Sequence, residues 1–64
     1  MERDEKSLAL ARRLFAEQEA RVRQQEEEVM RLRATGQPTD AAVGMLASMH
    51  RTLVTILGEI ARAS

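Results

Sequence analysis

One histidine lies within one of the most apolar runs of the chain, MLASMHRTLVTIL at residues 45–57, and its ring is the group best suited to chemistry. An imidazole can bind a metal ion, carry a proton near neutral pH, or form a hydrogen bond at an interface. A metal or catalytic site at His50 is the least favoured, because the chain has no second histidine and no cysteine, and no carboxylate stands at positions 46, 47, 53 or 54. We interpret His50 as a neutral histidine at a helix–helix interface, with a contact that protonation weakens as the alternative.

The charged residues do not form a metal-binding or nucleic-acid-binding pattern. The glutamates at 26–28 are consecutive, and consecutive residues point in different directions on a helix, so they do not converge on a cation. Arginines occur at 12–13, 21, 23, 31 and 33, but glutamates alternate with them, and ten basic residues balance ten acidic ones. Because phosphate binding needs clustered, unpaired cations, we expect a solvated surface and consider RNA or DNA binding the less favoured alternative.

The length and composition of the chain argue against an enzyme. A chain of 64 residues with no cysteine, no tyrosine and no glycine-rich phosphate loop has little with which to enclose an active site. We therefore predict no enzymatic activity, no cofactor and no bound metal. A core of this size barely offsets the entropy of the chain, and without disulfides or metals such a domain gains stability from association.

Two long helices separated by one turn account for the pattern of the sequence. In the segment TGQPTD at 35–40, Gly36 can take the left-handed C-cap conformation, Pro38 stops the first helix, and Thr39 or Asp40 can cap the second. Residues 2–35 contain no Gly or Pro and are rich in good helix formers. The predicted fold class is all-α, a single antiparallel hairpin with helix 1 at about 4–34, a turn at 35–39 and helix 2 at about 40–62.

Helix 1 carries one narrow stripe at coiled-coil spacing, which we call the helix 1 stripe. Two of its positions are glutamines, and these have two interpretations: a polar layer that selects the register of packing or the partner, or rim residues whose amides face water. The stripe consists of Leu8, Ala11, Phe15, Gln18, Val22, Gln25, Val29 and Leu32.

Helix 2 carries two apolar seams side by side, one residue apart in the sequence. Together they sweep more of the circumference than a surface helix normally buries, so one neighbouring helix with a narrow stripe cannot cover both. The first seam is Ala42, Leu46, Met49, Leu53, Ile56 and Ile60. The second seam is Val43, Ala47, His50, Val54, Leu57 and Ala61.

The short connection makes the helices antiparallel neighbours. Folding about residue 37 uses the first seam, and it leaves the second seam exposed together with an overhanging start of helix 1 at Leu8, Leu10 and Leu14. Exposed apolar surface of this extent marks an interface. The expected pairs are Val29 with Leu46, Val22 with Leu53, and Phe15 with Ile60.

We expect the exposed surface to mediate self-association into a homodimeric four-helix bundle, with a larger protein partner as the alternative occupant. The residues predicted to form these interfaces are Leu8, Leu14, Phe15, Val22, Val29, Leu46, Met49, His50, Leu53, Val54, Ile56, Leu57 and Ile60.

The N-terminal segment and the hydropathy pattern favour a cytoplasmic location. The start, MERDEKSLAL, has acidic residues among its basic ones and lacks the apolar centre of a secretory signal. No uninterrupted run of about eighteen apolar residues is present to span a bilayer. We therefore expect a cytoplasmic protein without membrane contact.

The segment LRATGQPTDAAVGMLASMHRTL, through Gly36, Thr39, Leu46 and Leu53, resembles the short helical-hairpin proteins common in proteobacteria. That resemblance implies a fold and no activity. In length and layout the chain is also similar to the plasmid repressor-of-primer hairpins, which dimerise into a four-helix bundle and bind paired RNA loops. The expected function is a non-enzymatic protein–protein interaction module, a small regulator or adaptor, and the alternative is a nucleic-acid-binding regulator that uses the arginines of helix 1.

Overall fold

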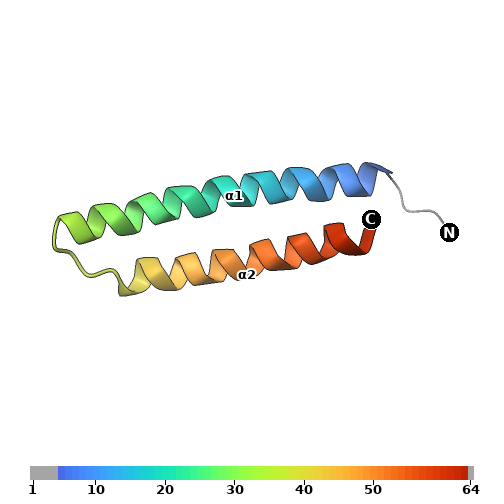
Figure 1. Cartoon of the computed structure of the whole chain (residues 1–64). Coiled ribbons are helices and arrows are strands. Elements are labelled where there is room, and N and C mark those ends of the chain that lie inside the picture. The colour runs from blue at the N-terminus through green and yellow to red at the C-terminus, as the bar shows by residue number, and fades with distance from the viewer. Residues whose placement is uncertain (1–4, 64) are drawn as a thin grey trace.

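The computed structural model describes residues 5–63 and shows two helices that run side by side in contact (Figure 1). Helix α1 spans Glu5–Ala34 and helix α2 spans Asp40–Ala63. The prediction of an all-α chain with two packed helices is confirmed, and the described residues contain no strand. The start expected for the first helix, at about residue 4, lies outside the described residues, and α2 ends at 63 rather than 62. The molecule is a rod of 54 × 14 × 11 Å.

A hydrogen-bonded cap ends α1. The Gln37 N–H donates to the Leu32 carbonyl at 2.8 Å, and the Gly36 N–H donates to the Arg33 carbonyl at 3.1 Å. This pair of bonds is a Schellman cap, which requires a left-handed residue after the helix. Gly36 supplies it with a φ of 72°, so the C-cap conformation expected of this glycine is confirmed.

Replacing Gly36 by alanine should lower the free energy of unfolding by about 1 to 2 kcal/mol, because a Cβ is strained in the left-handed region. The strain comes from the backbone alone, since no other atom lies within 4 Å of the added carbon. Gly44→Ala is the matched control: Gly44 also has open space but lies inside α2, where alanine should stabilise by up to about 1 kcal/mol. Urea denaturation followed by circular dichroism measures both, and two shifts of the same sign would contradict the prediction.

The core is a single line of contact between the helices. Among the described residues, those that are buried are Val22, Val29 and Gln18, with exposed fractions of 5 to 8%. All three belong to the helix 1 stripe, and the other members of that stripe are half-buried. Within residues 40–63 no side chain is buried. The hairpin by itself therefore leaves α2 largely accessible.

Two glutamines of α1 bond to the backbone of α2. The Gln18 side-chain N–H donates to the Met49 carbonyl at 3.1 Å, and the Gln25 side-chain N–H donates to the Ala42 carbonyl at 3.0 Å. The amides therefore cross the interface rather than facing water, which agrees with a polar layer between the helices.

The glutamine bonds correct the expected register of the helices. Val22 lies between the two glutamines and so faces α2 between their two acceptor carbonyls, at residues 42 and 49. Folding about residue 37 would place Gln18 near Leu57, so its bond to the Met49 carbonyl shows that α2 is shifted along α1 from the expected register. The contact of Val22 with Leu53 itself stays a prediction. Val29 and Leu46, which stand at the same offset as Val22 and Leu53, line a common groove.

The shift in register arises in the connection between the helices. Figure 1 shows the chain running back along α1 before α2 begins. Residues 37–39 are not helical, and three extended residues span up to about 10 Å, as much as about seven residues of helical rise. The pairs expected from a symmetric fold about residue 37 did not include the length of these extended residues. Thr39 ends the segment, and its carbonyl accepts the first bond of α2 from the Val43 N–H at 2.8 Å.

The free ends of the two helices lie together. Figure 1 shows α2 ending beside the first turns of α1. The overhanging start of α1 that we expected is therefore absent, because the backward run of the connection carries α2 along α1. Leu8 is half-buried, while Leu10 and Leu14 are exposed at 51% and 44%.

Candidate functional site

The two apolar seams of α2 have different surroundings. Every member of the first seam is half-buried against α1, and every member of the second seam is exposed. Val54 is 67% exposed and Leu57 is 51% exposed, although both are branched apolar side chains. Because the seams lie about 100° apart around the helix, α1 can cover only one of them. The second seam is therefore the candidate interaction surface.

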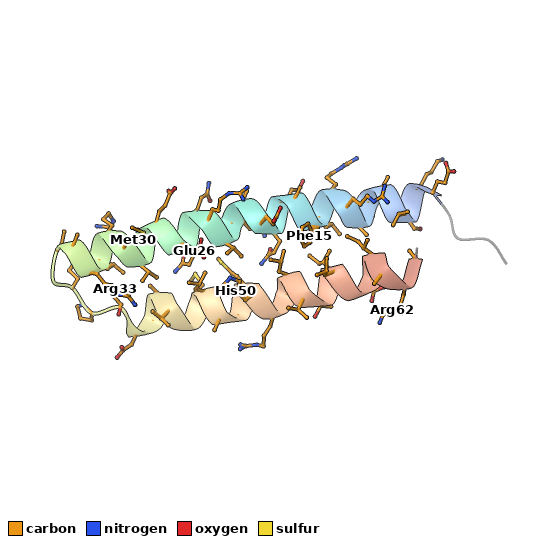
Figure 2. All side chains as sticks on the ribbon, viewed as in Figure 1. Phe15, Glu26, Met30, Arg33, His50 and Arg62 are labelled. Atoms are coloured by element: carbon orange, nitrogen blue, oxygen red, sulfur yellow. The ribbon has the colours of Figure 1, made fainter. Side chains whose placement is uncertain are left out.

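A groove joins the second seam to one flank of α1. Met30, 66% exposed, extends the apolar surface from Val43 onto α1. Figure 2 shows Met30 and the charged residues Glu26 and Arg33 along the half of α1 nearest the connection. This flank of α1 lies on the same side of the hairpin as the second seam. The groove is lined by Glu26, Val29, Met30 and Arg33 of α1 and by Val43 and Leu46 of α2.

The opposite side of the hairpin carries a second groove, to which α1 contributes Arg21, Glu28 and two glutamines. Leu14 lies seven residues before Arg21 and so falls on this side of α1. Leu14 was expected to join the interface of the second seam, and the structure places it away from that seam. Met45 is the exposed apolar residue that α2 contributes here. The lining of this groove is more polar than that of the groove beside the second seam.

His50 lies midway along α2 and is exposed on the second seam (Figure 2). Within residues 5–63 no three histidine, cysteine or acidic side chains come together in a way that could hold a metal ion. The neighbours of His50 along its seam are Ala47 and Val54, one turn away on either side. The position is that of a residue at the centre of an apolar surface.

The predicted interface residues divide into two groups. Those that belong to the second seam, His50, Val54 and Leu57, are exposed and available to another molecule. The others, apart from Leu14, lie between the two helices. They are Leu8, Phe15, Val22, Val29, Leu46, Met49, Leu53, Ile56 and Ile60.

Two ion pairs stand on the surface, Arg31 with Glu28 at 2.6 Å and Arg62 with Glu59. The hydrogen bond from Arg31 lowers the pKa of the Glu28 carboxyl, with the guanidinium charge adding to the effect. The same bond raises the pKa of Arg31. Both pairs are solvent-exposed and three residues apart on one helix, so they contribute little to stability.

By length and composition alone, α2 is apolar enough to cross a membrane, and it is the one such helix in the described part of the chain. The absence of an uninterrupted apolar run did not reveal this helix, because its apolar residues are interrupted by polar ones. Arg51 interrupts α2 near its middle, next to His50. A central arginine opposes insertion by about 2.5 to 3.5 kcal/mol. Insertion of α2 would also break the bonds from Gln18 and Gln25, so composition alone is a weak argument for a span.

No protein-family model, curated protein or solved structure matches this chain.

Proposed function

We propose that this chain is a non-enzymatic, cytoplasmic protein–protein interaction module, a small regulator or adaptor that acts through the second seam. The observation that supports it is that every member of that seam is exposed, on a helix in which no residue is buried. Contiguous exposed apolar surface of this kind is costly in water and is typical of an interaction site. The first occupant is a second copy of the chain, which gives a four-helix bundle.

Sedimentation of the wild-type chain tests this proposal. Over about 1 to 100 μM the weight-average mass should rise from that of one 7.2 kDa chain toward that of two, because association follows mass action. A well-folded monomer throughout that range would refute self-association. A larger protein partner would then be the remaining occupant of the second seam.

Nucleic-acid binding through the arginines of α1 is the competing function, and retention on immobilised RNA and DNA at increasing salt separates the two. The exposed arginines of α1 alternate with glutamates, so we expect no retention at physiological salt. Tight retention that weakens steeply with salt would overturn this expectation and favour a nucleic-acid-binding regulator.

His50→Leu should strengthen self-association, because it replaces a polar ring by an apolar side chain at the centre of the second seam. The dissociation constant should fall by about three-fold to ten-fold, a fraction of the value of burying a whole leucine. Sedimentation equilibrium measures the change. The control is Arg51→Leu, since Arg51 is exposed on α2 outside both seams. Weaker association of the His50 variant would show that the ring makes a specific polar contact.

A further inference from the structure

We propose that the second copy packs antiparallel to the first, about a two-fold axis level with Thr52 of α2 and close to Glu19 of α1, and that Arg12 of each copy pairs with Glu26 of the other. This inference rests on the proposed function, because it describes the geometry of that self-association. The occupant of the second seam is then the second seam of the other copy, and the flanks of the two α1 helices meet beside it.

The second seam is complementary to itself in the reverse direction. Its spacing alternates four and three residues and is the same from either end, so two antiparallel copies meet layer by layer. In two of the three layers a small side chain faces a larger one, which lets the layers interdigitate. The layers are Val43 with Ala61, Ala47 with Leu57, and His50 with Val54 of the second copy.

The flank of α1 beside the second seam is also complementary to itself. Arg12, Glu19 and Glu26 share this flank at a spacing of seven residues. When the flank is reversed about Glu19, Arg12 faces Glu26 of the second copy. Neither Arg12 nor Glu26 forms an ion pair within residues 5–63, so both charges are available to a partner.

The two centres of symmetry lie close together in the folded hairpin. Glu26 shares one groove with Leu46, and Arg21 shares the other groove with Met49. Counting from these pairs in opposite directions along the antiparallel helices places Glu19 level with residues 51 to 53 of α2, and counting from the two glutamine bonds places it near residue 48. The centre of the α1 flank and the centre of the second seam therefore lie within about one turn of each other along the hairpin. A two-fold axis through the centre of the second seam then passes close to Glu19.

The parallel alternative fits the surface chemistry poorly. In a compact bundle of two parallel hairpins, each α2 would stack on α1 of the other copy. The apolar second seam would then lie against Arg12, Glu19 and Glu26, whose charges would lose water without gaining an opposite charge. The antiparallel arrangement puts apolar seam on apolar seam and charged flank on charged flank.

Disulfide trapping tests the direction of packing. Because the sequence contains no cysteine, each disulfide must join the introduced residues. Val43→Cys and Ala61→Cys chains are mixed and oxidised, and the products are identified by mass. The antiparallel dimer should give the mixed disulfide as the main product. Two copies of position 43 should not join, because they lie about 27 Å apart along the helices. The exposed control is a mixture of Ser48→Cys and Ala61→Cys chains. Two results would overturn the arrangement: disulfides mainly between identical chains, or a yield of the mixed 43–61 disulfide no greater than that of the control mixture.

Charge exchange tests the Arg12–Glu26 pairs. Arg12→Glu alone, or Glu26→Arg alone, should weaken dimerisation by about ten-fold, since two pairs per dimer change from attraction to repulsion. The double variant R12E/E26R should return to within about two-fold of wild type. Arg13→Glu is the matched control, because Arg13 is exposed on the outer face of α1 and should change the dissociation constant little. Equal effects of Arg12→Glu and Arg13→Glu would refute the pairing.

These experiments separate this inference from the proposed function. A monomeric wild type refutes both. A wild-type dimer in which the mixed disulfide does not form, or in which the double variant does not recover, refutes the antiparallel arrangement and leaves self-association through the second seam intact.

Discussion

A chain that carries both Val54→Glu and Leu57→Glu should sediment as a monomer at concentrations where the wild type is a dimer. These two residues are the most exposed large apolar side chains of the second seam, at 67% and 51%. Burial of each is worth about 1.5 to 3 kcal/mol, and a glutamate in its place would bring an unpaired charge into an apolar contact. The dissociation constant should therefore rise by more than about 100-fold.

The matched control for this prediction is the chain with Ser48→Glu and Thr55→Glu. Both positions are exposed on α2 but lie outside the two seams, and the change in net charge is the same. The control should keep the wild-type dissociation constant to within a few-fold. If both double variants dissociate equally, net charge rather than the second seam governs association, and the candidate interaction surface is misplaced.

Val22→Asp should abolish cooperative folding. Val22 is 6% exposed and lies between the two glutamine bonds that join the helices. An uncompensated carboxylate in such a place costs about 3 to 5 kcal/mol, and few other buried side chains remain to offset it in a domain of this size. Thermal melting followed by circular dichroism should change from a sigmoidal transition to a gradual loss of helix.

Ala20→Asp is the control for the core prediction. Ala20 is exposed on the same helix two residues away, so the substitution tests helix propensity and charge without burial. It should lower stability by less than about 1 kcal/mol and keep the transition cooperative. A cooperative transition in Val22→Asp would mean that Val22 is not part of the core that joins α1 to α2.

The sequence by itself determined the local features of this protein. The apolar spacing and the helix formers predict two helices, and Gly36 with Pro38 predicts where the first ends. The side-by-side repeats of α2 also predict that one helix cannot bury both seams. Each of these features depends on residues within one or two turns of each other, and periodicity in the sequence records such relations directly.

Only the tertiary structure decided how the two helices meet. The spacing of apolar residues could not decide whether Val22 pairs with Leu53. When one helix shifts along the other, the same two seams still face each other, and only the paired residues change. The actual register depends on the length of the extended residues 37–39 and on the amides of Gln18 and Gln25, which reach carbonyls 31 and 17 residues away in sequence. A backbone carbonyl carries no residue-specific signal, so the sequence does not identify the acceptor. The register of α1 on α2 therefore required the folded hairpin.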